Sequence, residues 1–190
     1  MSNSQQNYIV GIGEALWDML PEGRKIGGAP ANFTYHVSQF GLDAVAVSAV
    51  GDDELGAEIR QTFEEKDLQT QLATVPYPTG TVAVTLDAKG IPQYEICEGV
   101  AWDNIPFSPE LEALARNTIA VCYGTLAQRN SVSRKTIESF IATMPADGIK
   151  ICDINLRGTF YNKEILESSM RACDILKIND EEIDEVSRLL

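Results

Sequence analysis

Short apolar runs alternate with amphipathic segments along most of this chain, and this alternation limits its fold more than any other feature. Residues 44–50 form a nearly continuous apolar run, which is typical of a strand buried on both faces. Residues 54–66 follow, with Leu55, Ile59 and Phe63 at helical spacing. A buried strand beside an amphipathic helix predicts the α/β class, with a mostly parallel sheet covered by helices on both sides.

The same two patterns recur toward both ends of the sequence. We expect further strands at residues 8–13, 118–123, 149–154 and 175–178. We expect further helices at residues 30–40, 109–116, 131–144, 163–172 and 180–190. In the first of these helices Pro30 stands at the start, where its missing N–H is tolerated, and Phe33, Val37 and Phe40 form the predicted core stripe.

Residues 70–97 depart from this alternation. Residues 81–86 and 92–97 read as strands joined by a turn-rich stretch, 87–91. Val82, Val84 and Leu86 alternate with smaller residues, as in a hairpin with one covered face. Because no helix fits between these strands, the segment is expected to form an antiparallel flap attached to the α/β layer.

Composition excludes several classes of partner and location. The 28 acidic residues exceed the 15 Lys and Arg, which gives a formal charge of −13 and argues against nucleic acid and anionic lipid as ligands. No apolar run reaches the roughly 18 residues of a membrane span, and the polar N-terminus does not resemble a signal peptide. The four cysteines are widely separated, which indicates reduced thiols and a cytoplasmic protein.

Several familiar motifs fail. Gly11 and Gly13 follow the first strand, but Leu16 takes the third glycine position of the dinucleotide fingerprint, so an NAD-dependent dehydrogenase is a weak alternative. His36 is the single histidine, which excludes an HExxH metal site, and it is expected to be a packing residue. No Gly-Lys pair and no GxSxG occur, which excludes a phosphate loop and a hydrolase nucleophile elbow.

A glycine pair before the helix at 30–40 is the first candidate site. Gly27 and Gly28 let backbone approach a ligand closely, and the helix start offers free N–H donors. Asn32 in the first turn presents both a donor and an acceptor, and the Asp18 carboxylate, just past the first strand, accepts hydrogen bonds from hydroxyls. The alternative is an ordinary glycine turn before a helix that starts with proline.

Two further candidates follow later strands. Asp153, Asn155 and Arg157 would share one face if the strand at 149–154 continued, at the sheet edge where α/β proteins bind ligands. Arg157 offers a forked cation for phosphate, although a structural Asp–Arg pair explains the same pattern.

The second of these candidates begins at Lys177, which precedes Asn179 and Glu182. Asn179 and Glu182 have the spacing of a helix capping box, which needs no ligand. A cation beside these two residues is equally suited to organising phosphates and Mg²⁺.

In combination these motifs resemble the PfkB-type carbohydrate kinases of the ribokinase-like superfamily. The glycine-rich signature of that family is matched by Gly27, Gly28, Asn32, Thr34, Gly41 and Gly51. The GEAxxD, PTG, DxNxR and NxxE motifs follow in the order of the family, at residues 13–18, 78–80, 153–157 and 179–182. Residues 99–103 and 124–129 look most like the fructokinase branch.

The resemblance implies a three-layer α/β/α ribokinase-like fold with a small antiparallel β lid, whose strands lie within residues 15–27 and 79–98. Residues 1–190 would form a partial domain that lacks the C-terminal part of the family fold. The lid would close over the sugar, and its exposed edge invites pairing between two subunits, so a homodimer is expected.

The resemblance also implies an ATP-dependent transfer of the γ-phosphate to a primary hydroxyl of a sugar, with fructose as the first choice. The residues expected to bind the sugar are Asp18, Gly27, Gly28, Asn32, Asp153 and Asn155. Arg157 would lie beside the transferred phosphate. Lys177, Asn179 and Glu182 would hold ATP, with Mg²⁺ at Glu182, directly or through water, and K⁺ as a further cation.

One family element is missing from these residues. The Gly-Ala-Gly-Asp signature that carries the catalytic base does not occur, so the 190-residue chain alone is expected to be inactive. Two alternatives remain open. One is a non-catalytic sugar-binding or regulatory module, and the other is a kinase for ribose, 2-keto-3-deoxygluconate or a nucleoside.

Overall fold

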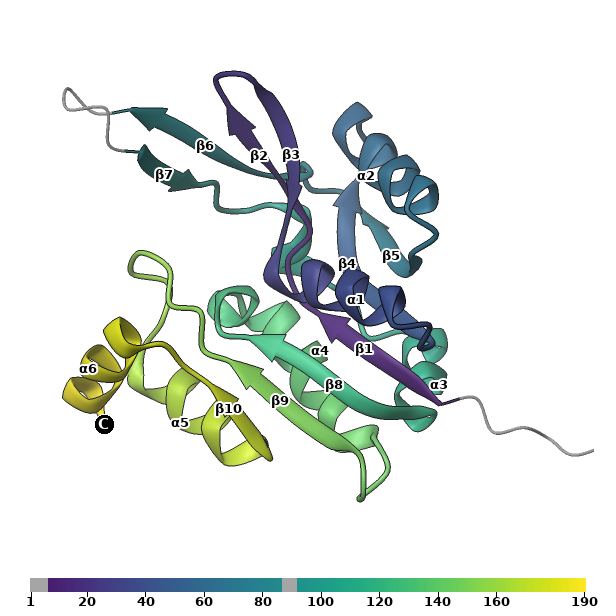
Figure 1. Ribbon diagram of the computed structural model, residues 1–190, viewed down its shortest axis with the longest axis vertical. Coiled ribbons are helices and arrows are strands. Elements are labelled where there is room, and N and C mark those ends of the chain that lie inside the picture. The colour runs from purple at the N-terminus through teal and green to yellow at the C-terminus, as the bar shows by residue number, and fades with distance from the viewer. Residues whose placement is uncertain (1–6, 87–91) are drawn as a thin grey trace, which may run out of the picture.

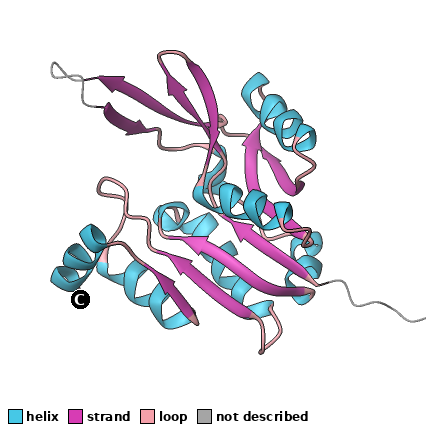
Figure 2. Cartoon of the chain, in the orientation of Figure 1, coloured by secondary structure: helices cyan, strands magenta, loops and turns pink. Residues whose placement is uncertain are grey.

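The computed structural model describes residues 7–86 and 92–190, which build two separate β-sheets (Figures 1 and 2). The larger sheet has six strands in the order β10-β9-β8-β1-β4-β5, and every pairing in it is parallel. Its strands are β1 (Tyr8–Ile12), β4 (Ala44–Gly51), β5 (Gln69–Val75), β8 (Thr118–Gly124), β9 (Ile149–Asp153) and β10 (Ile175–Lys177). This confirms the predicted α/β class with a parallel main sheet.

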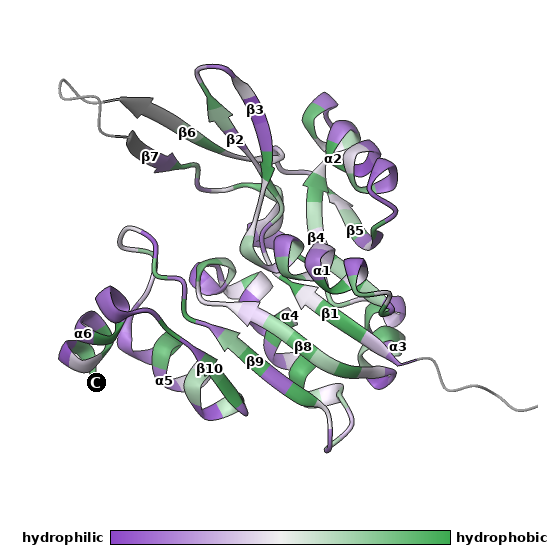
Figure 3. Cartoon of the chain, in the orientation of Figure 1, coloured by the Kyte–Doolittle hydropathy of each residue, from purple (hydrophilic) through white to green (hydrophobic). Residues whose placement is uncertain are grey.

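The helices cover both faces of this sheet. They are α1 (Ala29–Gln39), α2 (Glu54–Glu65), α3 (Pro109–Arg116), α4 (Ser131–Thr143), α5 (Lys163–Ala172) and α6 (Asp180–Leu189), with short 3₁₀ turns at η1 (Ala101–Asn104) and η2 (Leu126–Arg129). Alternate side chains of β4 pack on the two opposite faces of the main sheet. Val47 joins the core that contains Phe140 of α4, while Val50 joins the core that contains Phe63 of α2. Figure 3 shows the apolar interior strands between the more polar helix surfaces.

Helix α1 packs on the sheet with small residues, which differs from the predicted stripe. Its buried residues are Pro30, Ala31 and Thr34, whereas Phe40 is 84% exposed. His36 is also exposed and is not a packing residue. The reason is close contact with β1: a side chain at Gly11 would place its Cβ 2.2 Å from the Pro30 carbonyl oxygen, so no large residue fits between the two elements.

The smaller sheet contains four strands in the order β3-β2-β6-β7. They are β2 (Leu16–Leu20), β3 (Gly23–Gly27), β6 (Gly80–Leu86) and β7 (Pro92–Ile96). The sequence pattern predicts an antiparallel lid, but β2 and β6 pair in parallel and the sheet is mixed. The two hairpins enter the sheet from separate points in the chain, and their adjacent strands run in the same direction. The predicted turn at 87–91 lies outside the described residues.

Strand β5 corrects a second expectation. Residues 70–75 read as the beginning of the flap, yet they form the edge of the main sheet, paired with β4 over its whole length. The flap begins only at Thr79, whose amide donates to Asp53 Oδ2 at 2.8 Å and whose hydroxyl donates to Asp53 Oδ1 at 2.6 Å. These bonds attach β6 to the start of α2, so the boundary lies four residues after β5 ends.

A buried ion pair ties the other end of the smaller sheet to the main body. Arg129 in η2 forms a two-pronged pair with Asp103 in η1, and the two side chains are 7% and 2% exposed. The same guanidinium donates to the Cys97 carbonyl just after β7 and lies between the rings of Trp102 and Phe160. Within residues 7–86 and 92–190, no helix is long and apolar enough to cross a membrane.

Substituting Asp103→Asn tests how much the Arg129–Asp103 pair contributes to stability. Arg129 would stay buried without an opposite charge, so we expect the free energy of unfolding to fall by about 3–5 kcal/mol, measured by urea denaturation. The matched control is Glu112→Gln, which removes the exposed partner of Arg116 and should change stability by less than about 1 kcal/mol. Equal effects at both positions would show that the Arg129–Asp103 pair is not a stabilising connection.

Candidate functional site

A cavity of about 710 Å³ lies between the smaller sheet and the carboxyl ends of the main-sheet strands. Both polar and apolar side chains line it. The lining residues are Glu14, Leu16, Asp18, Gly27, Gly28, Ala29, Asn32, Val82, Tyr94, Ile96, Leu126, Asn155, Leu156, Arg157, Gly158 and Phe160. Both sheets therefore contribute to one hollow, as expected for a ligand site in an α/β protein.

The glycine pair forms one wall through its backbone. Gly28 has φ +115°, a conformation that favours glycine, and it caps the start of α1. A Cβ on Gly28 would lie 2.2 Å from the Glu14 carbonyl oxygen, and a Cβ on Gly27 would lie 2.6 Å from Asp18 Oδ2. Absence of side chains at these two positions thus keeps Asp18 and the start of α1 close together.

Asp18 and Asn32 reach the same cavity from different elements. Asp18 is half-buried on β2, and burial raises the pKa of its carboxyl, while the nearby charge of Arg157 acts in the opposite direction. Asn32 lies exposed in the first turn of α1. A partly desolvated carboxylate beside an amide suits hydroxyl-rich ligands, because the two groups together accept and donate hydrogen bonds.

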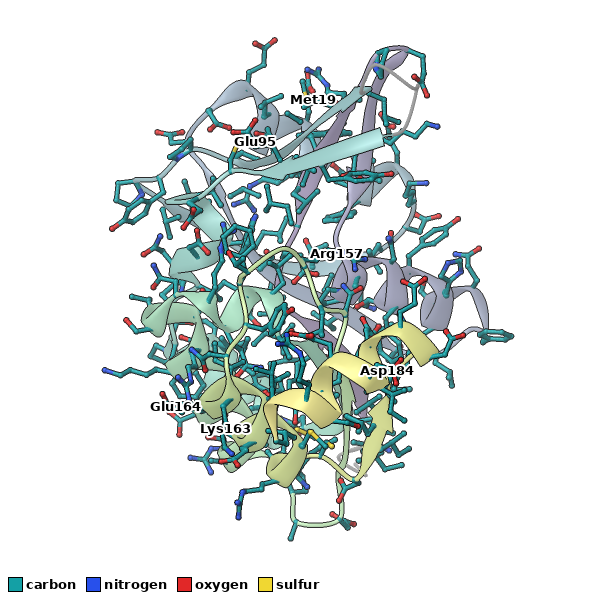
Figure 4. The ribbon with its side chains drawn as sticks, turned by 90° about the vertical axis from the view of Figure 1, so that its left-hand side faces the viewer. Met19, Glu95, Arg157, Lys163, Glu164 and Asp184 are labelled. Atoms are coloured by element: carbon teal, nitrogen blue, oxygen red, sulfur yellow. The ribbon has the colours of Figure 1, made fainter. Side chains whose placement is uncertain are left out.

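Arg157 approaches from the opposite side, on the loop that follows β9. Figure 4 shows it between the smaller sheet, marked by Met19 and Glu95, and helix α6, marked by Asp184. The chain turns sharply at Asn155, which has φ +44°, and Arg157 itself is exposed at the cavity wall. A cation there can meet an anionic group on a ligand.

Asp153 does not share this location. Strand β9 ends at Asp153, and the left-handed turn at Asn155 breaks the predicted two-residue periodicity. Asp153 instead pairs with Lys177 on the neighbouring strand, with Nζ at 2.9 Å and 3.0 Å from its two carboxylate oxygens. It lies outside the cavity lining, and the expectation that it faces the ligand together with Asn155 and Arg157 is not met.

Asn179 and Glu182 form the capping box that their spacing predicts. Asn179 Oδ1 accepts the Glu182 N–H at 2.7 Å, and Glu182 Oε2 accepts the Asn179 N–H at 3.1 Å. The other Glu182 oxygen accepts the Leu156 N–H at 2.9 Å, which fastens the Arg157 loop to α6. Both carboxylate oxygens thus accept backbone N–H groups, so direct Mg²⁺ binding by Glu182 does not fit. Of the predicted Mg²⁺ site at Glu182, only the form with contact through water is compatible with this arrangement.

No group of three His, Cys, Asp or Glu side chains able to hold a metal ion occurs among the described residues. Lys177 is exposed at the end of β10, with its charge directed to Asp153. Lys177 and Asn179 therefore lie together at the carboxyl edge of the sheet, but outside the cavity lining.

Sequence reasoning missed Glu14, although the GEAxxD motif contains it. Its side chain is 3% exposed and lines the cavity, and its Oε1 accepts the Ala29 N–H at 3.2 Å. Burial raises the pKa of Glu14 to about 7, against the smaller opposing effects of backbone hydrogen bonds and Arg157. The available signal was its position directly after Gly13, where β1 ends and the chain turns toward β2.

Comparison with known proteins identifies the family of this chain. The model of the pfkB family carbohydrate kinases matches residues 22–190, so the chain belongs to the PfkB family of carbohydrate kinases. It is 26% identical over 190 residues to a fructokinase of Salmonella typhimurium, covering 93% of this chain and 61% of the relative. It is 24% identical over 196 residues to an ATP-dependent 6-phosphofructokinase of Thermoanaerobacterium thermosaccharolyticum, covering 94% and 60%. The chain thus spans about 60% of the length of these relatives.

Solved structures show the same fold. A fructokinase from Xylella fastidiosa with bound ATP has a TM-score of 0.83 at 21% identity, covering 97% of this chain and 61% of that one. A double mutant of fructokinase from Vibrio cholerae, with fructose, ADP and a potassium ion bound, has a TM-score of 0.75 at 22% identity, covering 100% and 65%.

Substituting Gly28→Ala tests the close approach at the glycine pair. The strain of a positive φ costs about 1–3 kcal/mol, and the clash with the Glu14 carbonyl adds to it, so we expect a marked drop in unfolding midpoint in urea. Gly41→Ala is the matched control, because Gly41 has φ +74° but nothing within 4 Å of the added Cβ. If Gly41→Ala destabilises as much as Gly28→Ala, the close contact contributes nothing beyond the backbone strain.

Proposed function

We propose that this protein is an ATP-dependent sugar kinase that transfers the γ-phosphate to a primary sugar hydroxyl, with fructose as the preferred sugar. The observation that carries the proposal is the shared cavity, which brings Asp18, Asn32 and Arg157 together from three separate segments. A polyol needs several donors and acceptors in one partly enclosed space, and this cavity offers them beneath a β-sheet.

The sugar would lie against the glycine pair and under the smaller sheet, which would act as its lid. Asp18 and Asn32 would accept and donate hydrogen bonds to sugar hydroxyls, while Gly27 and Gly28 would allow the sugar to approach the backbone. Asn155 would contribute from the loop after β9. Ile96 and Val82 of the smaller sheet line the same cavity and would cover the apolar face of the sugar ring.

Arg157 would stabilise the negative charge of the phosphoryl group during transfer. Among the described residues, its guanidinium donates only to the carbonyl of its neighbour Leu156, which leaves its other donors for a ligand. Phosphoryl transfer depends mainly on positioning and charge stabilisation, which a cation at the wall of the sugar cavity can supply. Lys177 and Asn179 would contact the phosphates of ATP, with Mg²⁺ reached through water at Glu182.

The choice of ATP and fructose is supported by the relatives. One curated relative at 26% identity is named a fructokinase, and the neighbours in fold include a fructokinase that holds ATP and one that holds fructose, ADP and potassium. Potassium is proposed as an additional cation on that ground. The proposal places the protein in the cytoplasm, in keeping with four free cysteines, and a homodimer through the edges of the smaller sheet stays a prediction.

Substituting Asp18→Asn tests the sugar site. Loss of a half-buried charged acceptor should weaken fructose binding about tenfold, measured by calorimetric titration of the chain. Asp43→Asn is the matched control, because Asp43 is exposed at the opposite end of the main sheet, before β4. Unchanged fructose affinity in Asp18→Asn would remove Asp18 from the proposed site.

The same titration defines the sugar. Fructose should bind more tightly than ribose, 2-keto-3-deoxygluconate, a nucleoside or a phosphorylated fructose, and NAD should not bind. The phosphorylated sugar is included because one relative is named a 6-phosphofructokinase. Preference for another of these compounds would reject fructose. If a protein that also contains the Gly-Ala-Gly-Asp element binds the sugar but does not phosphorylate it, the non-catalytic sugar-binding module is favoured.

The 190-residue chain alone is expected to be nearly inactive. It contains no Gly-Ala-Gly-Asp element, and general-base catalysis is typically worth about 10²–10⁴-fold. In a coupled assay with ATP and fructose, the rate of ADP formation should stay near the background rate. Robust turnover by the purified chain would show that its own residues supply the base.

A further inference from the structure

Glu14 is the buried acidic group whose place in the cavity has no explanation from the family motifs used above. It is 3% exposed at the end of β1, and it lines the cavity together with Asp18 and Gly28. Its Oε1 accepts the Ala29 N–H, but its Oε2 has no hydrogen-bond partner among the described residues. Buried carboxylate oxygens without a partner are rare in folded proteins, because they have lost water without a replacement.

Three other buried polar atoms of the described residues also lack a partner. They belong to Ser48, Trp102 and Arg129. None of these residues lines the large cavity, whereas Glu14 does. The unpartnered oxygen of Glu14 is therefore the one that a ligand in this cavity can satisfy.

We propose that Glu14 is a sugar-binding residue whose free carboxylate oxygen accepts a hydroxyl of the bound polyol. This inference rests on the proposed polyol site and adds a second carboxylate to it, deeper than Asp18. Oε1 keeps its bond to the Ala29 N–H, and no hydrogen bond from the described residues occupies Oε2, which is therefore free to accept a sugar hydroxyl. The link from Oε1 to the Ala29 N–H would then connect the bound sugar to the first residue of α1.

Charge decides which form of Glu14 binds. The titratable and charged groups that act on it from other segments are Arg157 and Asp153, in β9 and the loop after it, and the Cys122 thiol on β8; Asp153 is itself paired with Lys177. Oε1 already accepts an N–H, and a hydroxyl donated to Oε2 makes a second bond of the stronger, charge-assisted kind. The ionised carboxylate is therefore the binding form, and sugar binding should release a proton from Glu14.

The ionisation of Glu14 determines whether fructose affinity rises or falls with pH. In the empty chain the pKa of Glu14 is about 7, raised by burial, so the group is largely protonated at pH 6 and largely ionised at pH 8.5. Fructose affinity should rise about fivefold between these values, since hydrogen bonds to charged groups are stronger than neutral ones. Stability of the empty chain should move the opposite way, because a folded pKa above the unfolded value favours folding below pH 4.5 and loses that contribution as pH rises through 7.

The experiment is calorimetric titration of the chain with fructose at pH 6 and pH 8.5, for wild type, Glu14→Gln and Glu164→Gln. Glu164 is an exposed carboxylate outside the cavity lining, which Figure 4 shows below Arg157 and away from the smaller sheet, and it serves as the matched control. Glu14→Gln should bind like wild type at pH 6, about fivefold more weakly at pH 8.5, and with little change between the two. Glu164→Gln should follow wild type at both values.

The outcomes separate the two proposals. If wild type binds none of the sugars tested, the proposed function and this inference both fail. If wild type binds fructose and Asp18→Asn weakens it, but wild-type affinity is constant or falls with pH, the sugar site stands and Glu14 is not its ligand. Should Glu14→Gln not fold, the pH profile of Asp18→Asn decides, because a rise that this variant retains cannot come from Asp18 and supports Glu14, whereas a rise that it loses overturns the inference. A rise retained in full by a folded Glu14→Gln assigns the titration to Asp18 and overturns the inference.

Discussion

The close packing of the Gly27–Gly28 turn on the end of the first strand is the contact on which the rest of the site depends. Gly28 lies against the Glu14 carbonyl oxygen in a conformation that suits glycine, and Ala29 then donates its N–H to the Glu14 side chain. This brings the start of α1 directly onto the carboxyl end of β1. The cavity exists because two backbone segments meet there without side chains between them.

Electrostatics gives that cavity a distinct character. Glu14 and Asp18 are partly or fully removed from water and their pKa values are raised by burial, while Arg157 approaches from a separate loop and opposes the shift at both. The chain as a whole is acidic, with a formal charge of −13, but at this cavity the exposed Arg157 guanidinium places a positive charge near the two carboxyls. Such an arrangement suits the proposed ligand, a sugar with an uncharged part near the carboxyls and a phosphoryl group near Arg157.

The smaller sheet is joined to the main body through polar contacts as well as packing. Thr79 bonds to Asp53 at the beginning of β6, and Arg129 bonds to the Cys97 carbonyl just after β7. Arg129 also lies against Phe160, which belongs to the loop that carries Arg157 and which lines the cavity. The smaller sheet and the loop that carries Arg157 are thus connected through one buried guanidinium, so displacement of the sheet would also move the Arg157 wall of the cavity.

Local patterns in the sequence determined the α/β class, most strand and helix positions, the capping box at Asn179, and the strand ends that carry polar residues. These follow from hydrophobic period and helix-end chemistry, which act over a few residues. Only the tertiary structure decided that β2 and β6 run in parallel, that β5 belongs to the main sheet, and that Asp153 pairs with Lys177 rather than facing the cavity. It also decided that Glu14 is buried with one oxygen unpartnered. The partner and pKa of a side chain depend on distance and burial between segments far apart in the chain, and neither is encoded in the spacing of neighbouring residues.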